Sequence, residues 1–280
     1  MNRSGLIRIL FGTCILALVS CGGAKEEKLE VEEKEKTPDT TQIPVVPPVE
    51  TLSYDTLLID RNKINEQDTF RFYYWRSTVK GAPDSAVTAI NQFVNAFLFR
   101  EMRPIVPNRT PGSLSELVNT LALRIEEAGS RATPWQCSAG GRVIYANPNV
   151  LTFRCFFNYN KGDEIPVNTV RYISFNPLTG KVLTPNRVLA DMNRVNQIAE
   201  RKFRAQKKLS GRADLEDAGF RFENNRFSLD NNCGITDEGL VFYFNPGEIA
   251  PFSLGSTEIR ISYNELDSLY TYPADTLLQL

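Results

Sequence analysis

The spacing of apolar residues predicts two strands and two amphipathic helices in the first half of the chain. Aromatic and β-branched residues concentrate in residues 57–60 and 69–79, which we expect to be strands. From residue 83 to 102 apolar residues recur at helical spacing, which predicts an amphipathic helix. A second helix is expected over residues 113–129, whose first four residues, Ser-Leu-Ser-Glu, have the capping-box form.

The second half is predicted to be mostly β-structure around one long helix. That helix is expected over residues 185–208, and the Arg and Lys residues on its exposed face fit either a solvated surface or a ligand groove. Strands are expected at residues 142–146, 150–159, 167–175, 226–229, 240–245 and 257–263, with a short one ending near Leu183. Helices and strands are grouped rather than alternating. We therefore expect an α+β fold with antiparallel sheets and packed helices.

The first 20 residues have a different pattern, typical of a signal peptide. Arg3 and Arg8 precede an apolar run that is too short to span a bilayer. The run ends in Leu-Val-Ser-Cys, which fits the lipobox of bacterial lipoproteins, in which a thiol is acylated before the peptidase cuts. We therefore expect residues 1–20 to be a lipoprotein signal peptide and Cys21 to carry the lipid. The alternative is a cytosolic protein with an apolar N-terminus.

Residues 21–50 are predicted to form a tether between the lipid and the globular part. Glu and Lys dominate residues 25–36, and four prolines follow, so the segment lacks the apolar residues needed for a core. Lys25-Glu26-Glu27 fits either an export signal to the outer face or an ordinary charge run. We expect the cell envelope as the location, with the lipid on Cys21 in the outer membrane. Both the periplasmic face and the cell surface remain open.

Composition excludes several classes of function. The chain of 280 residues has no histidine, which removes Ser-His-Asp hydrolysis, Cys-His hydrolysis and His-ligated catalytic zinc. Losing the two arginines of the signal peptide takes the net charge from −1 to about −3, and no basic arm is present, so nucleic-acid binding is not expected. About 230 residues remain beyond Glu50, enough for one large core or two small ones. We expect no cofactor and no metal ion.

Three cysteines remain in the globular part of the chain once Cys14 and Cys21 are set aside. Cys137, Cys155 and Cys233 match no zinc-binding spacing. The predicted hairpin places Cys155 nearer to Gly141 than to Cys137, which weighs against a disulfide between the two cysteines. One disulfide and three small buried side chains both remain open.

Three segments near the C-terminus resemble a known family. They are Asn232–Asn245, which includes Cys-Gly-Ile-Thr-Asp-Glu-Gly-Leu, then residues 248–255 and residues 259–266, and residues 175–183 add Phe-Asn-Pro-Leu-Thr-Gly-Lys-Val-Leu. Together they resemble the extracellular domain shared by RsiV-like anti-sigma factors and PdaC-like peptidoglycan deacetylases, of the DUF3298/DUF4163 type, whose function is unknown. The resemblance covers residues 51–280 as one α+β domain, and its specific part is the signature at residues 172–269.

The resemblance implies a binding role rather than catalysis. The RsiV relative binds lysozyme through this domain, which makes the loop with Glu248, Pro251 and Phe252 a candidate contact, although Phe252 stands where the family often has tyrosine. The chain has neither the sigma-binding segment of the anti-sigma factor nor the histidine-metal half of the deacetylase. We therefore expect a lipid-anchored envelope protein with a non-catalytic domain that binds a cell-wall glycan or a wall-degrading protein such as lysozyme.

Two alternatives of other classes remain. One is a carboxylate-dependent glycan hydrolase that draws its acid and base from Glu248, Glu258 and Glu265. The other is a structural or assembly lipoprotein with a protein partner. The loop around Phe252 also fits a purely structural connection, and Asp237 and Glu238 are expected to lie in a tight turn rather than to act as an acid/base pair.

Overall fold

Two β-sheets organise the part of the chain that the computed structural model describes. These residues are 53–65, 68–81, 83–106, 108, 111–127, 133–162, 164–266 and 269–271, and all belong to one compact unit, Val46–Leu280. The predicted signal peptide, Cys21 and the predicted tether lie outside the described residues. Helices and strands pack as an α+β fold, as the sequence predicts.

The first sheet has five strands in the order β1-β2-β3-β4-β5. Its strands are β1 (Ser53–Asn65), β2 (Asp68–Lys80), β3 (Trp135–Ala146), β4 (Leu151–Lys161) and β5 (Val167–Phe175). Neighbours are antiparallel except β2 and β3, which run parallel. The antiparallel arrangement expected from the sequence therefore holds for every pair of neighbours in this sheet except β2 and β3.

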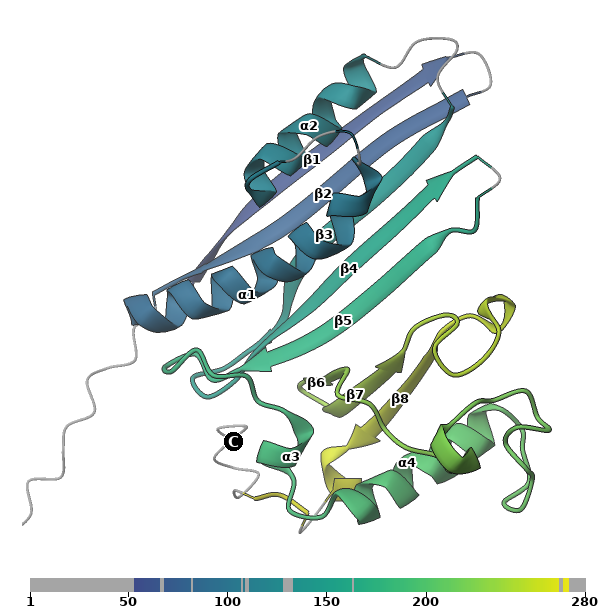
Figure 1. Ribbon diagram of the computed structural model, residues 1–280. Coiled ribbons are helices and arrows are strands. Elements are labelled where there is room, and N and C mark those ends of the chain that lie inside the picture. The colour runs from purple at the N-terminus through teal and green to yellow at the C-terminus, as the bar shows by residue number, and fades with distance from the viewer. Residues whose placement is uncertain are drawn as a thin grey trace, which may run out of the picture. The chain divides into compact units, whose positions relative to one another are not determined.

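The parallel pair follows from the two helices inserted between β2 and β3. α1 (Asp84–Met102), a 3₁₀ turn η1 (Arg103–Ile105) and α2 (Leu114–Glu126) return the chain to the end at which β2 started, which parallel pairing requires. Figure 1 shows both helices over the same face of the sheet. The expected cap is present, because the Ser113 hydroxyl accepts a hydrogen bond from the Glu116 amide at 3.2 Å.

The core under these helices is built by alternation along β2. Phe70, Phe72 and Tyr74 point toward α1 and α2 and are almost completely buried, whereas Arg71 and Tyr73 face the other way. The same alternation on β4 buries Phe153 and Phe157. Period-2 burial on the strands and an apolar stripe on each helix therefore meet in one core, as the spacing of apolar residues predicts.

The second half forms a smaller sheet with its own core. β6 (Cys233–Ile235), β7 (Gly239–Phe244) and β8 (Thr257–Ser262) pair antiparallel, and α4 (Met192–Gln206) contributes Val195, Ala199 and Phe203 to the core beside them. Shorter elements complete this half: α3 (Pro185–Val188), η2 (Glu223–Asn225), η3 (Phe252–Leu254) and η4 (Tyr263–Leu266).

Two predictions for this half are wrong. The helix expected over residues 185–208 is interrupted, because Leu189 is extended and bridges Tyr270, and the Asp191 carboxylate then caps α4 by accepting from the Arg194 amide at 3.0 Å. Residues 226–229 form no strand. The Leu229 amide donates to the Asn196 side chain at 2.9 Å instead of to a ladder.

Asn232 joins the two sheets through its buried side-chain amide. Its Oδ1 accepts from the Tyr172 amide at 2.8 Å, and its Nδ2 donates to the Val170 carbonyl at 2.8 Å. The backbone carbonyl of Asn232 accepts from the Tyr243 amide of β7 at 3.0 Å. One residue therefore satisfies the outer edge of β5 and extends the smaller sheet.

Two further side chains close the same edge of β5. Asn245 Oδ1 accepts from the Val170 amide at 2.7 Å, and Ser174 Oγ accepts from the Ile235 amide at 2.9 Å. Apolar packing of Phe156, Tyr172 and Val241 covers the junction from one side. The Val170 amide and carbonyl and the Tyr172 amide are thus paired on this edge, although no described strand lies next to β5 in the ladder.

We predict that Asn232→Ala lowers the free energy of unfolding by about 2–4 kcal/mol, because two buried backbone groups of β5 lose their partners. Urea denaturation followed by circular dichroism measures this change. Asn231→Ala is the matched control, since Asn231 is exposed, and its effect is expected to be within about 0.5 kcal/mol. Equal effects of the two substitutions would contradict the role given to Asn232.

Candidate binding groove

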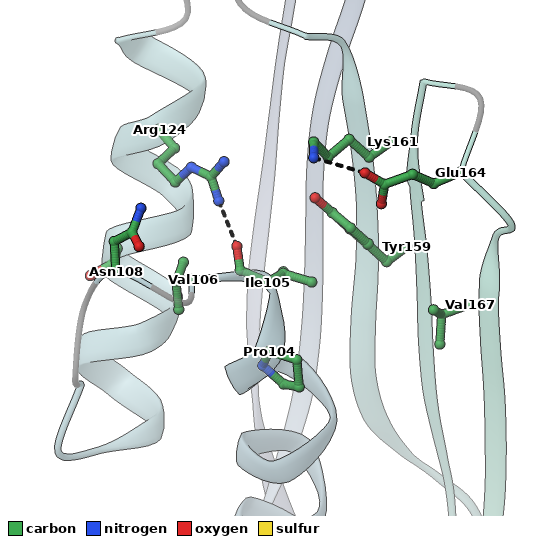
Figure 2. A pocket seen from close by; sticks show the side chains of 10 residues that line it. Pro104, Ile105, Val106, Asn108, Arg124, Tyr159, Lys161, Glu164 and Val167 are labelled. Atoms are coloured by element: carbon green, nitrogen blue, oxygen red, sulfur yellow. Dashed lines mark hydrogen bonds and ion pairs between the residues drawn. The ribbon is translucent and has the colours of Figure 1, made fainter.

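A groove of about 540 Å³ lies between the helices and one end of the first sheet. Figure 2 shows Arg124 of α2 on one wall and Tyr159, Lys161 and Glu164 on the other. The remaining lining residues are mostly apolar and come from the segment after α1, from α2 and from the start of β5: Pro104, Ile105, Val106, Asn108, Thr120 and Val167. An apolar lining with a few polar groups is typical of a small-molecule site.

Arg124 is held in place from two sides. Its Nη1 donates to the Ile105 carbonyl at 2.9 Å, and its guanidinium carbon lies 5.1 Å from the centre of the Trp135 ring. A planar cation fixed by stacking and one hydrogen bond loses little freedom when a carboxylate binds, because its geometry is set beforehand. Arg124 therefore provides a preorganised anion contact.

The opposite wall carries a more adaptable cation. Lys161 Nζ lies 2.9 Å from the Glu164 carboxylate, and both side chains are more than one-third exposed. The Glu164 carboxylate raises the pKa of Lys161, so the ammonium is charged at neutral pH. Exposed ion pairs of this kind contribute little to stability, so a ligand carboxylate can displace Glu164 at small cost.

Tyr159 adds an aromatic surface with a neutral hydroxyl. Burial raises the pKa of Tyr159, so it keeps its proton at neutral pH. Its ring stacks on Phe157 with an interplanar angle of 9° and lies 6.5 Å from Trp135. The groove thus combines two cations, one carboxylate and an aromatic hydroxyl, which suits a ligand that carries a carboxylate beside less polar groups.

Arg142 forms a second cationic feature, on the face of the sheet away from the helices. Its guanidinium carbon lies 4.4 Å from the Trp75 ring and 5.6 Å from the Phe156 ring. Gly140 leaves room for this packing, because a Cβ there would lie 2.9 Å from the Phe156 ring. These contacts use Arg142 to hold the rings together, so the groove is the stronger ligand candidate.

The loop predicted as a contact is anchored on the smaller sheet. Glu248 points back into its own turn, where its carboxylate accepts from the Asn245 amide at 2.6 Å. Burial raises the pKa of Glu248, and the neighbouring Asp230 carboxyl raises it further. Pro251 and Phe252 are exposed, the latter by 37%. Of the three, Pro251 and Phe252 remain available for a partner, and their role stays a prediction.

The two other candidate carboxylates are each paired. Glu258 accepts from the Tyr172 hydroxyl at 3.1 Å and from Arg260 Nε at 2.8 Å. Glu265 lies 2.8 Å from Lys202 Nζ, and this pairing lowers the pKa of Glu265 to about 2. A carboxyl with such a pKa is ionised at neutral pH, so Glu265 is unsuited to donate a proton to a leaving group.

The three described cysteines are free and buried, so the expectation of small buried side chains is confirmed over the disulfide. Cys155 lies opposite Gly141, as the predicted register requires, and Cys137 lies opposite Tyr159. Burial raises the pKa of Cys155 to about 12, so its thiol is protonated and unreactive at neutral pH. Within the described residues no three His, Cys, Asp or Glu side chains form a metal-binding group.

Sequence reasoning did not find the groove. Arg124 lies in the last turn of α2, next to the apolar stripe of that helix, while Tyr159 and Lys161 end a strand far along the chain. The parallel pairing of β2 with β3 places that helix beside the ends of β4 and β5, and this pairing had no signal in the sequence. The alternation of Tyr159 and Lys161 at a strand end was the only local indication of a shared face.

The arrangement of helices over a five-stranded sheet joined to a smaller sheet occurs in solved structures. A DUF3298 family protein from Bacteroides fragilis has a TM-score of 0.58 at 14% identity, covering 82% of this chain and 98% of that one. A DUF3298 family protein from Pseudomonas aeruginosa has a TM-score of 0.56 at 15% identity, covering 80% of this chain and 96% of that one. At this level of sequence identity, the similarity shows that this chain shares their fold.

Residues 182–264 match the family model described as "Protein of unknown function (DUF3298)". The chain therefore carries a DUF3298-type domain, and the predicted resemblance is confirmed at this level. A short segment is also 37% identical over 38 residues to immunogenic proteins MPB64 of Mycobacterium bovis and MPT64 of Mycobacterium tuberculosis. That match spans only 17% of the length of these curated relatives. Among the described helices, none has the length and apolarity to cross a bilayer.

We predict that Glu265→Gln destabilises the protein slightly at neutral pH and not at about pH 2. The folded-state pKa of Glu265 is about 2, below the ordinary value of about 4.3, so its contribution is present above about pH 4.3 and is lost as pH falls through about 2. The pair with Lys202 is more than one-third exposed, so the effect is below about 1 kcal/mol. Urea denaturation at both pH values measures it, with the exposed Glu223→Gln as control. A difference between wild type and Glu265→Gln that grows toward low pH would contradict the assignment.

Proposed function

We propose that this protein is a lipid-anchored component of the cell envelope whose globular domain binds a cell-wall fragment without cleaving it. The lipobox ending in Cys21 and the absence of histidine support the anchor and the lack of common hydrolytic chemistry. The observation that carries the binding role is the groove, in which Arg124 and Lys161 face each other across an apolar and aromatic lining. The ligand class is a wall-derived glycopeptide with free carboxylates.

The size and chemistry of the groove favour a small glycopeptide over a folded protein as its occupant. A cavity of about 540 Å³ lies within the usual range for small-molecule sites. Sugar rings offer apolar faces that can lie on Tyr159, while peptide carboxylates can reach the two cations. A wall-degrading protein such as lysozyme would instead need a wide exposed surface, for which the loop with Pro251 and Phe252 is the alternative contact.

The binding role predicts a charge-dependent affinity for soluble peptidoglycan fragments. Lys161→Glu is expected to weaken binding about tenfold or more, because it replaces an attraction by a repulsion, and added salt should weaken binding of the wild type. Isothermal titration calorimetry with the full chain in detergent measures both effects. Arg201→Glu makes the same charge change on the exposed side of α4 and should leave the affinity unchanged.

The same titration separates the alternatives. Fragments with amidated carboxylates should not bind if Arg124 and Lys161 recognise those groups. Binding of lysozyme with no binding of any fragment would move the site to another surface. Release of shortened glycans from the fragments would replace the binding role by carboxylate-dependent hydrolysis.

We also predict that lipidation depends on Cys21. Cys21→Ser should abolish incorporation of a labelled fatty acid and release the protein from the membrane fraction, because a serine hydroxyl does not replace the acylated thiol. Cys14→Ser is the control and should leave both unchanged. Protease treatment of intact cells then distinguishes the surface from the periplasmic face, and a Cys21→Ser protein that stays labelled would disprove the anchor.

A further inference from the structure

The two edges of the five-stranded sheet differ in how their backbone groups are treated. The edge at β5 is closed by side chains of Asn232, Asn245 and Ser174. The opposite edge is β1, a strand of 13 residues, and no described strand pairs with its outer side. A long open edge is a template for another strand, so native proteins usually shorten, cover or charge it.

β1 is also the element with the most exposed large apolar side chains among the described residues. Tyr54, Leu57, Leu58 and Ile64 are each exposed by between 47% and 69%. Exposed apolar groups on both faces of an edge strand are unfavourable in a monomer, because a neighbouring strand would remove part of their surface from water. Their concentration on one open edge indicates that another strand covers it.

The charges of β1 determine which partner fits. Asp55 and Lys63 lie eight residues apart, with Asp60 and Arg61 between them. Two copies that pair antiparallel about a twofold axis must place residues of the same parity opposite each other, because only alternate residues direct their backbone groups outward. Each possible register is therefore defined by the residue at the axis.

Only some of these registers avoid like charges. An axis at Asp60 or at Arg61 would bring two identical charges together. An axis at Ile59 places Asp55 opposite Lys63 of the second copy, twice by symmetry, and pairs the whole strand. It also places Tyr54 opposite Ile64 and Leu58 opposite Asp60 of the second copy, so no like charges face each other directly.

We propose that two copies of this chain associate through antiparallel pairing of β1 with its axis at Ile59. The partner is a second copy rather than an unrelated strand, because the charge pattern of β1 is complementary to itself in the full-length register. Asp55 now pairs with Lys80, and Lys63 donates to the Glu126 carbonyl. Asp55 is exposed and Lys63 is partly exposed, so both can exchange these partners for each other. The pairing joins two five-stranded sheets into one of ten strands.

Cysteine cross-linking of the full chain in cell envelopes tests the proposed register. Ile59→Cys is expected to give a disulfide-linked dimer after mild oxidation, because paired residues at the axis lie within about 5.5 Å between Cα atoms. Thr56→Cys is the control, since the two copies of residue 56 would lie about 20 Å apart. The native cysteines of the domain are buried and do not contribute.

Charge exchange tests the same pairing in solution. Asp55→Lys is expected to raise the dimer dissociation constant about tenfold or more, and Asp55→Lys combined with Lys63→Asp should restore it. Analytical ultracentrifugation of the full chain in detergent measures the constant, and circular dichroism checks that each variant folds. Asp217→Lys on an exposed turn is the matched control and should have no effect.

The outcomes separate clearly. A dimer cross-linked through Leu58→Cys but not through Ile59→Cys supports β1 self-pairing with the axis one residue away, where Asp55 would face Arg61. A chain that is monomeric at high micromolar concentration and gives no cross-link at either position overturns the proposal. Neither result depends on ligand binding in the groove. The proposed dimer and the proposed binding role are therefore tested independently.

Discussion

The side-chain amide of Asn232 is the interaction on which the arrangement of this molecule depends. A sheet edge exposes alternating N–H and C=O groups, and burying them without partners costs free energy comparable to a lost hydrogen bond. Asn232 supplies one acceptor and one donor to β5 in the way that a neighbouring strand would. Because the same residue also bonds to β7 through its backbone, the two sheets share one polar junction.

Because of this junction, the two halves of the domain have different structural roles. The smaller sheet and α4 form a separate core and close one edge of the larger sheet. The larger sheet is then free to present its strand ends to α1 and α2, where the groove forms. The two edges of the first sheet therefore differ. Side chains bond to backbone groups of β5 at one edge, whereas no described strand pairs with the outer side of β1 at the other.

The sequence predicted the local elements well where one pattern was strong. α1 and α2 could be recognised from apolar spacing and a serine cap, and β4 and β5 from aromatic and β-branched runs. The first half of β3 was missed because Ser138, Gly140 and Gly141 weaken the strand pattern there. The break at Leu189 was missed because its cause, a bridge to Tyr270, is a tertiary contact.

Long-range pairing explains why the candidate site was harder to predict than the elements. Asn232 was recognised as part of a signature, yet its role requires knowing that β5 lies beside it. Arg124, Tyr159 and Lys161 become neighbours only through the sheet order. Glu248 looked exposed in a loop rich in Pro and Gly, whereas its carboxylate bonds to its own turn, a local contact that the spacing from Asn245 allows.

The parallel contact between β2 and β3 has a consequence for how the chain acquires its structure. The β1–β2 hairpin and the β3–β5 meander each form from residues close in sequence, whereas the contact between them joins residues as distant as Arg71 and Gln136. Closing such a long loop costs entropy before any contact repays it, so this step is expected to be slow. Until α1 and α2 dock, the two pieces expose the faces that later meet, so the rate of folding is governed by the pairing of β2 with β3.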